Sequence, residues 1–256
     1  MQMTKVTSRD GTTIAYERTG RGPALVLVAP ALHNRAAAVV LAELLSARFT
    51  VYNYDRRGRG ESGDTAPYAV EREIEDLDAV IAQAGRSAYV YGSSSGAVLA
   101  FRAAAAGSHI SRLAMFEPPF VGSSPEVVKR YADLIEAGDH EGALEHLHKA
   151  IGVPDEIVRR LPDTPTWPAM AAMAHTMLYD FAITSVDGGA VPTELLAELS
   201  TPTLVLASDG SSDHLREAAS ATAEALPSGS YRCLPGQWHG VTEERLAAEL
   251  ADFFIA

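Results

Sequence analysis

The sequence is poor in cysteine and in positive charge. Its single cysteine, Cys233, excludes a disulfide within the chain, so the fold has to depend on a hydrophobic core. Lys and Arg number 21 against 33 Asp and Glu, which gives a net charge of −12. This excess of negative charge repels a phosphate backbone, and we expect no nucleic-acid partner.

Long hydrophobic runs are also absent. Charged residues interrupt each apolar stretch well before the roughly 20 residues that are needed to span a bilayer. The amino-terminal stretch MQMTKVTSRDGTTIAY lacks the apolar centre of a signal peptide. We therefore expect no membrane anchor and a cytoplasmic location.

Apolar residues are nevertheless plentiful. They make up 47% of the 256 residues, and charged residues make up 21%, so the chain can bury a sizeable core. A chain of this length exceeds the usual single domain, but α/β folds of this size commonly form one core with an insertion. One compact enzyme is the first expectation.

Strand and helix signals alternate along the first 120 residues. Short apolar runs predict strands, and stretches with helical spacing of apolar residues predict helices between them. Such alternation is typical of an α/β fold with a mostly parallel central sheet flanked by helices. The predicted strands are 13–19, 24–28, 49–54, 88–91 and 113–116, and the predicted helices are 35–47, 70–84 and 96–106.

The pattern then changes to helices alone. Ser124-Pro125 begins a predicted helix that ends near Gly138, a second runs to Gly152, and a third covers about 169–181. Strand signals return at 203–207 and 230–233. We therefore predict a core formed by residues 1–120 and 198–256, with a helical cap inserted at 121–197. The methionines of the third helix, Met170, Met173 and Met177, either line a pocket under this cap or belong to its core.

The stretch GSSSG at 92–96 matches the pattern G-x-S-x-G. It lies between a predicted strand and a predicted helix, which is the context that this motif requires. Side chains two positions either side of Ser94 would collide with neighbouring elements at such a sharp turn, and glycine removes that obstruction. The pattern predicts a nucleophilic serine at 94, although a Gly/Ser-rich connection without a catalytic role has the same composition.

A serine hydroxyl is a poor nucleophile unless its surroundings activate it. Ser94 would sit at the amino terminus of the predicted helix, whose free N–H groups favour a developing negative charge. The N–H of Ser95 is therefore a candidate donor in an oxyanion hole.

At this point the sequence resembles the α/β-hydrolase family, in its serine-nucleophile branch with a helical cap. The stretch DRRGRGES at 55–62 is similar to the D-x-R-G-x-G-x-S loop after the family's fourth strand. The family order is serine, acid, then histidine in a loop after the last strand. His239 stands in the loop GQWHG at 236–240, and the resemblance implies that it is the general base.

Histidine suits this role because it gains and loses a proton near neutral pH. A loop histidine that only caps the following helix is the alternative reading of His239. The histidines at 140, 146 and 148 lie in a polar helical stretch without an i, i+4 pair for a metal. We expect no metal and no cofactor.

The chain departs from the family at two places. The family usually has His-Gly after its third strand, whereas this chain has Ala29-Pro30; the resemblance implies that Ala31 donates the second oxyanion N–H. The position of the usual acid falls on Ser211, which cannot orient a histidinium. Two acids can replace it. Glu117 ends the sixth strand, where some haloalkane dehalogenases have their acid, and Asp209 lies two residues before Ser211.

We favour Glu117 as the triad acid. The alternative reading of Glu117 is a residue that caps backbone groups above Pro118-Pro119. A site in which a water takes this role, or which has no acid, also stays open.

The resemblance implies a hydrolase that acts on ester bonds. Ser94 would form an acyl-enzyme with a small, apolar acyl substrate that is an ester, lactone or thioester. Two alternatives stay open: the same site used for acyl transfer, cyclisation or elimination, and an inactive member that only binds a ligand. The oligomeric state stays open as well.

Two other enzyme classes are disfavoured. The stretch GRGESG at 58–63 satisfies G-x-G-x-x-G, but the loop continues through 64–67 instead of opening into a helix, as a dinucleotide site requires. Dehalogenases and epoxide hydrolases use a carboxylate nucleophile, and residue 94 is serine.

Overall fold

The computed structural model describes residues 3–85, 87–120, 123–153, 155–186 and 190–256. Its centre is an eight-stranded sheet with the order β1-β2-β4-β3-β5-β6-β7-β8. β2 pairs antiparallel with β1 and β4, and all other neighbours are parallel. The strands are β1 (Met3–Thr7), β2 (Thr13–Gly20), β3 (Ala24–Val28), β4 (Thr50–Tyr54), β5 (Ala88–Ser93), β6 (Ile110–Phe116), β7 (Thr203–Ser208) and β8 (Gly229–Leu234).

The strand order reverses direction at β3. From β3 the chain moves to β4 on one side, and from β4 it crosses to β5 on the other side. In open α/β sheets, ligands bind beyond the carboxyl ends of the strands at such a switch point. The loops after β3 and β5 therefore flank the expected position of a site.

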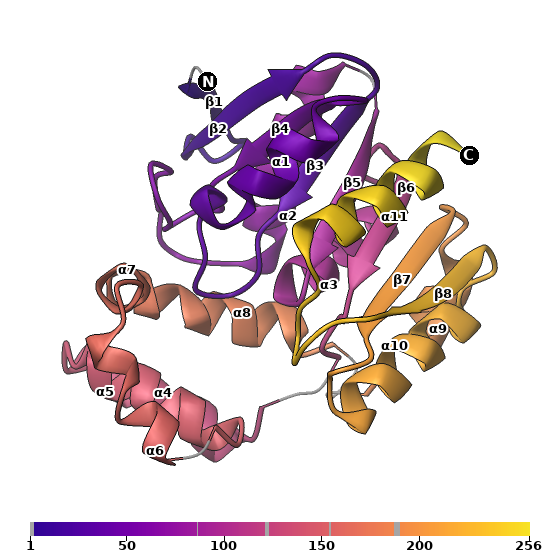
Figure 1. The fold of residues 1–256 in the computed structure, drawn as a ribbon. Helices are drawn as coiled ribbons and strands as arrows, with labels where there is room; N and C mark the ends of the chain where they lie inside the picture. The colour runs from indigo at the N-terminus through magenta and orange to yellow at the C-terminus, as the bar shows by residue number, and fades with distance from the viewer. Residues whose placement is uncertain (1–2, 86, 121–122, 154, 187–189) are drawn as a thin grey trace.

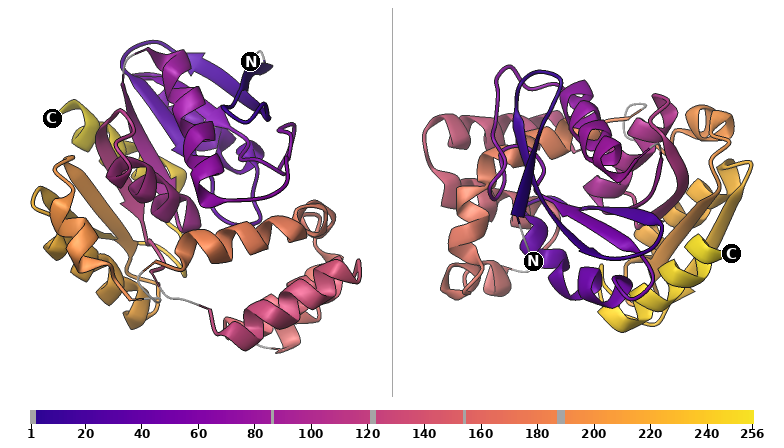
Figure 2. Two further views of the ribbon diagram at one scale, coloured as in Figure 1. Left: turned by 180° about the vertical axis from the view of Figure 1, so that it is seen from behind. Right: turned by 90° about the horizontal axis from the view of Figure 1, so that it is seen from above.

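Helices cover both faces of the sheet (Figures 1 and 2). One face packs in a large apolar cluster against α2 (Val70–Ala84), α3 (Ser95–Ala105) and α10 (Asp213–Ala225). The other face packs against α1 (Val39–Leu45) and α11 (Glu243–Ile255). The sequence-based prediction of an α/β core with a mostly parallel sheet is confirmed.

Two details of this core differ from the predictions. The edge strand β1 was not predicted, because its residues MTKVT are almost all exposed and give no apolar run. The predicted helix at 35–47 is a short 3-10 turn, η1 (Arg35–Ala38), followed by α1, which ends at Leu45.

Helices also fill the chain between β6 and β7. They are α4 (Pro125–Glu136), α5 (His140–Ala150), α6 (Asp155–Val158), α7 (Trp167–Ala172), α8 (Met177–Thr184) and α9 (Thr193–Glu198), with the 3-10 turns η2 (Leu161–Asp163) and η3 (Ala174–Thr176). Among them, α4, α5, α7 and α8 share an apolar cluster that includes Tyr131, Leu144 and Trp167. α8 lies between the core on one side and α4 and α5 on the other (Figures 1 and 2).

The last part of the predicted insertion also packs against the core. Ile183 and Val186 at the end of α8, and Leu196 of α9, belong to the apolar cluster of the core. The first boundary, at residue 121, lies outside the described residues. The division at 121 and 197 therefore stays a prediction.

The predicted third helix of the insertion is broken into three pieces. The Thr176 hydroxyl donates a buried hydrogen bond of 2.7 Å to the Met173 carbonyl. Such local bonds compete with the α-helical ladder, and here they accompany a 3-10 turn between α7 and α8. Met173 is buried, and Met170 and Met177 are partly buried in the insertion's own cluster.

No helix among the described residues is both long enough and apolar enough to cross a membrane.

Candidate active site

Ser94 occupies a sharp turn between β5 and α3. Its backbone has φ 53° and ψ −124°, outside the helical and extended regions. A Cβ on Gly92 would lie 2.4 Å from the Gly96 carbonyl oxygen, and a Cβ on Gly96 would lie 2.5 Å from the Val28 carbonyl oxygen. Both distances are far below van der Waals contact, so the turn requires glycine on each side of the serine.

The same turn is fixed to the neighbouring strands. The Ser94 N–H donates a 2.8 Å hydrogen bond to the carbonyl of Phe116, the last residue of β6. The close approach of Gly96 to Val28 fixes the turn against the end of β3. Ser94 is partly exposed at the carboxyl edge of the sheet.

Several loop residues at this edge of the sheet have a strained backbone conformation. Among the described residues, four that are not glycine have a positive φ: Leu32, Ser94, Glu117 and His239. They follow β3, β5, β6 and β8. Left-handed backbone costs free energy in residues with a side chain, and such residues cluster at functional sites. The strain therefore marks one site at the carboxyl edge of the sheet.

Glu117 and His239 meet at this edge. His239 Nδ1 lies 2.5 Å from Glu117 Oε2. Because a carboxylate only accepts hydrogen bonds, Nδ1 carries the proton and donates, which leaves Nε2 free to accept a proton. The pair thus has the tautomer that a general base requires.

Several donors hold Glu117 in its charged form. Its side chain is fully buried, and Oε1 accepts a 2.7 Å hydrogen bond from the Ser208 N–H. Burial raises the pKa of Glu117, but the hydrogen bonds from His239, Ser208 and Ser211 outweigh it and leave the pKa below its ordinary value of 4.5. Glu117 therefore remains a carboxylate at neutral pH.

Asp209 has a different partner. Its Oδ1 accepts a 2.9 Å hydrogen bond from the Gly236 N–H, and the residue is exposed. Ser211, which occupies the position of the family's usual acid, accepts a 2.8 Å hydrogen bond at Oγ from the His239 N–H. Both residues thus hold the backbone of the histidine loop, and the structure does not bring Asp209 to the imidazole.

Among the described residues, no hydrogen bond joins Ser94 to His239. In enzymes without substrate the contact between nucleophile and base is often long, and it tightens when the substrate binds. His239 keeps about a quarter of its side chain exposed, so its ring is accessible from the site.

The two predicted oxyanion donors lie on the loops that the Gly96–Val28 approach brings together. Ser95 is the first residue of α3, and Ala31 follows β3 by three residues. Within the described chain, neither N–H has a hydrogen-bond acceptor. Both groups are therefore free to donate to an oxygen atom of a bound molecule. Of the neighbouring loop residues, His33 Nδ1 contacts the Ala31 carbonyl at 2.7 Å.

Two buried arginines contact carbonyl groups of the loop after β3. Arg56 Nη1 lies 3.3 Å from the Ala29 carbonyl oxygen, and Arg59 Nη1 donates a 2.8 Å hydrogen bond to the Pro30 carbonyl. Asp180 of α8 pairs with both arginines, at 2.8 and 2.7 Å. The insertion thereby holds the loop that carries Ala31. Both arginines belong to the motif at 55–62, but the sequence did not indicate their pairing with Asp180, because it joins segments more than 120 positions apart.

Glu73 and Asp180 compensate the charge of this cluster. Glu73 accepts hydrogen bonds from Arg56 Nε and Nη2 at 2.8 and 3.0 Å. Burial raises the pKa of Asp180, but Arg56 and Arg59 lower it below its ordinary value. Leu32 adds an apolar link, since its side chain packs in the cluster of the insertion.

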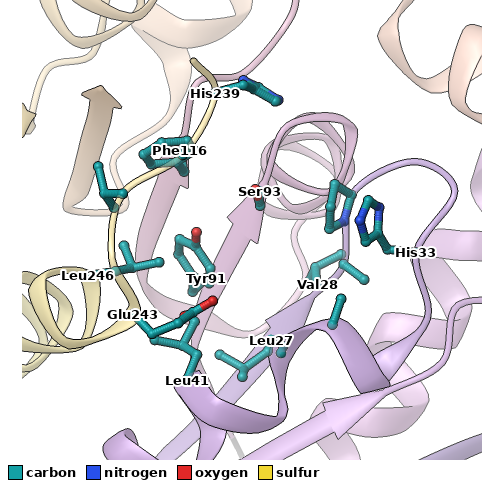
Figure 3. Close-up of a pocket in the computed structure, with 16 residues that line it drawn as sticks. Leu27, Val28, His33, Leu41, Tyr91, Ser93, Phe116, His239, Glu243 and Leu246 are labelled. Carbon is teal, nitrogen blue, oxygen red and sulfur yellow. The ribbon is translucent and has the colours of Figure 1, made fainter. Parts of the chain in front are cut away.

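A cavity of about 190 Å³ opens beside His239 on the α1/α11 side of the sheet (Figure 3). Its walls come from the ends of β3, β5 and β6, from α1, and from the loop leading into α11. They are mostly apolar. In the part of the chain that the structure describes, no group of three or more His, Cys, Asp or Glu side chains is placed to hold a metal ion.

The comparison with family models agrees with this architecture. The model described as "Alpha/beta hydrolase family" matches residues 12–253, which is most of the chain. The chain therefore belongs to the alpha/beta hydrolase family, as the motifs around Ser94, Asp55 and His239 predicted.

Solved structures are similar over almost the whole chain. A crystal structure of an alpha/beta hydrolase from Sphaerobacter thermophilus is 44% identical, with a TM-score of 0.92, and the match covers 98% of this chain and 100% of that one. An enol-lactonase from Burkholderia xenovorans LB400 is 20% identical, with a TM-score of 0.78 and a match that covers 99% and 100% of the two chains. At this identity the second likeness shows the fold alone.

One curated relative has a known activity. N-formylmaleamate deformylase from Pseudomonas putida is 35% identical over 124 residues, which is 45% of this chain and 46% of that protein. The match therefore spans about half the length of this relative.

Proposed function

We propose that the protein is a serine hydrolase that cleaves a carboxylic ester, lactone or thioester through an acyl-enzyme on Ser94. The observation that carries the proposal is the contact between Glu117 and His239 Nδ1 at the same edge of the sheet as a serine on a strained, glycine-flanked turn. A nucleophile, a base with a free Nε2 and a buried carboxylate are the three parts of a catalytic triad.

In the proposed reaction, His239 Nε2 takes the proton of Ser94 as Oγ attacks the substrate carbonyl carbon. The carbonyl electron pair moves onto oxygen, and the N–H groups of Ala31 and Ser95 donate hydrogen bonds to that oxygen. The intermediate collapses, the bond to the leaving group breaks, and His239 returns its proton to the leaving group. Water then attacks the acyl-enzyme in the same way and releases the acid.

Glu117 is the proposed acid of this triad. Its carboxylate would hold the imidazole in the required tautomer and stabilise the imidazolium that forms when His239 takes the proton. The buried position and the lowered pKa of Glu117 support this role, because the carboxylate keeps its charge at neutral pH. The exposed position of Asp209 argues against the alternative acid.

The proposed substrate is a small molecule with an apolar acyl or alcohol group. The mostly apolar walls of the cavity beside His239 support this class. We propose hydrolysis over acyl transfer because about a quarter of the His239 side chain is exposed, so water can reach the base that would activate it.

A panel of esters, lactones and thioesters with short acyl groups tests the proposal. Wild-type protein should turn over at least one class, and Ser94→Ala should lower kcat by a factor of about 10⁴ or more. A burst of the first product, followed by a slower steady rate, would reveal the acyl-enzyme. Turnover that persists in Ser94→Ala would contradict the proposed nucleophile.

Removal of a formyl group from an amide nitrogen is a second candidate. It is favoured by the 35% identity with N-formylmaleamate deformylase over 124 residues. The same triad would attack the formyl carbon and release formate after hydrolysis of a formyl-enzyme. Including N-formylmaleamate in the substrate panel tests this candidate directly, since turnover of this amide without turnover of esters would replace the first proposal.

A further inference from the structure

The peptide group between Pro30 and Ala31 carries one of the two proposed oxyanion donors, the Ala31 N–H. The proline ring fixes φ of Pro30, but its ψ stays free, so the plane of the following peptide group can rotate. The direction of the Ala31 N–H therefore depends on the contacts that this peptide group makes.

Arg59 makes such a contact. Its Nη1 donates a 2.8 Å hydrogen bond to the Pro30 carbonyl, which belongs to the same peptide group as the Ala31 N–H. Among the described residues the only cis peptide bond is Ala66-Pro67, so this group is trans, and its C=O and N–H point in opposite directions. The hydrogen bond from Arg59 thus directs the N–H away from the buried arginine.

Arg59 is itself held in place by the insertion. Its side chain is fully buried, and Nη2 donates a 2.7 Å hydrogen bond to Asp180 Oδ2 of α8. Because the guanidinium group is planar and rigid, the contact with Asp180 also determines where Nη1 lies. A charged donor makes a stronger hydrogen bond than a neutral one, and it polarises the peptide group so that the N–H at its other end becomes a better donor.

The same ion pairs reach the other proposed donor. Arg56 Nη1 donates to Asp180 Oδ1 at 2.8 Å and lies 3.4 Å from Ser95 Oγ. Within the described chain, the Ala31 and Ser95 N–H groups have no acceptor of their own. One buried cluster therefore contacts both segments that carry the proposed donors.

We propose that Arg59 is a positioning residue of the oxyanion hole, which orients and polarises the Pro30–Ala31 peptide group through its hydrogen bond to the Pro30 carbonyl. The inference rests on the proposed function, because an oxyanion forms only if Ser94 attacks a carbonyl. Arg59 does not contact the substrate. Its loss should therefore weaken binding of the transition state and leave binding of the substrate unchanged, so that kcat falls at constant KM.

Arg59→Lys and Arg57→Lys form a matched pair of variants. Lysine keeps the positive charge but lacks the fork of the guanidinium group. An unpaired buried charge costs more than a lost hydrogen bond, so the ammonium group at position 59 should stay with Asp180 and leave the Pro30 carbonyl. Arg57 is equally buried in the same motif, but its hydrogen bonds go to Asp10, Arg72 and Asp76.

The pair should differ in steady-state kinetics on the best substrate. Arg59→Lys should lower kcat about tenfold or more, approaching the loss of one oxyanion donor, with KM within about twofold of wild type. Arg57→Lys should keep both values near those of the wild type. Arg59→Met, which removes the charge as well, should lower kcat at least as much as Arg59→Lys, and circular dichroism under the assay conditions shows which variants are folded.

Phenylboronic acid tests the oxyanion hole without turnover. Ser94 Oγ forms a bond to boron while the serine proton passes to His239, and boron becomes tetrahedral and negatively charged, with a hydroxyl group in the position of the oxyanion. Such analogues bind in proportion to the stabilisation of the transition state. The Kd measured by calorimetry should rise about tenfold or more in Arg59→Lys and stay near the wild-type value in Arg57→Lys.

The Ala31 amide proton reports the hydrogen bond directly. Proline with carbon-13 at its carbonyl and alanine with nitrogen-15 select the amides of the three alanines that follow a proline, which are Ala24, Ala31 and Ala169. When the boronate binds to the wild type, the Ala31 proton signal should move downfield more than the other two. This movement should be smaller in Arg59→Lys and unchanged in Arg57→Lys, which a merely structural role of Arg59 would not produce.

The outcomes separate this inference from the proposed function. If the wild type binds the boronate but a folded Arg59 variant keeps the wild-type kcat and Kd, the positioning role is overturned and the proposed function stands. Equal losses of kcat in Arg59→Lys and Arg57→Lys would also overturn the role, because they would report a general disturbance of the motif. If the wild type neither binds the boronate nor cleaves any substrate of the panel, the proposed function fails, and the positioning role fails with it.

Discussion

At the scale of single residues, the site depends on side chains held where the backbone is strained. Glu117 has φ 43°, and its side chain is fully buried. Its N–H donates a 2.9 Å hydrogen bond to the carbonyl of Leu206 in β7. Its carboxylate reaches over to Ser208 and His239. The strand register of β6 and β7 therefore determines where this acid points.

The first prediction concerns the identity of the triad acid. Glu117→Gln keeps the shape of the side chain but removes the charge that would stabilise the imidazolium, so kcat should fall by a factor of about 10² to 10⁴. Asp209→Asn should leave kcat within about threefold of wild type, because the only hydrogen bond of the Asp209 carboxylate among the described residues comes from the Gly236 N–H. Steady-state kinetics on the best ester measures both. The reverse ranking would assign the role to Asp209.

The second prediction concerns the stability of the fold at acid pH. The pKa of Glu117 lies below 4.5 in the folded protein and returns to its ordinary value in the unfolded chain, so the unfolded chain takes up a proton first as the pH falls. The stability that Glu117 contributes is complete above its unfolded pKa and disappears as the pH falls through its folded pKa. Glutamine cannot titrate in this way.

Urea unfolding of wild type and Glu117→Gln between pH 7 and pH 3.5 tests this dependence. The difference in free energy of unfolding should be largest at neutral pH and should narrow toward the acid end. A difference that stays constant over the range would show that Glu117 does not titrate with a lowered pKa.

The sequence could predict some site residues and not others. Ser94 and His239 follow from local patterns, a G-x-S-x-G turn between a strand and a helix and a loop after the last strand. The choice between Glu117 and Asp209 depends on distances between strands, which no local pattern reports. Ser211 has a contact with His239 that only the folded loops create.

At the scale of elements, the loop after β4 links the core to the insertion. Arg57 pairs with Asp76 of α2 at 2.7 Å, while Arg56 and Arg59 both reach Asp180 of α8. The D-x-R-G-x-G-x-S motif therefore holds three arginines whose side chains are fully buried. Such pairs stabilise little in total, but removing one partner leaves an uncompensated buried charge.

The third prediction concerns the loss of one partner from these buried ion pairs. Asp180→Ala should lower the free energy of unfolding by about 3–5 kcal/mol, since two buried guanidinium groups lose their shared partner. Asp133→Ala breaks an exposed pair with Lys129 on α4 and should cost less than about 1 kcal/mol. Urea denaturation followed by circular dichroism measures both variants. Equal losses would contradict the importance of the buried cluster.

The predictability of the elements varied with their environment. Buried strands such as β3 were predicted from short apolar runs, because a strand covered on both faces carries apolar residues at most positions. The exposed edge strand β1 has no such run, and its pairing with β2 decides its conformation. The break between α7 and α8 depends on the Thr176 hydroxyl and on packing within the insertion, which helical periodicity does not report.

At the scale of the whole molecule, the sheet gathers residues from distant parts of the chain. Ser94, Glu117 and His239 follow β5, β6 and β8, and the oxyanion loop follows β3. All four segments end at the same edge, because these strands are parallel. The alternation of strands and helices predicted that these strands are parallel and end at one edge. The contacts between the insertion and the oxyanion loop could be found only in the structure.

The central claim is that Ser94 is an activated nucleophile. Labelling with a fluorophosphonate probe tests it most directly, since the probe reacts covalently with serines that a neighbouring base activates. Fragmentation of the labelled peptide distinguishes Ser94 from its neighbours Ser93 and Ser95. We predict that the wild type carries one label, on Ser94, and that Ser94→Ala carries none, while His239→Ala reacts far more slowly. A wild-type protein that stays unlabelled, or a label on another residue, would contradict the account.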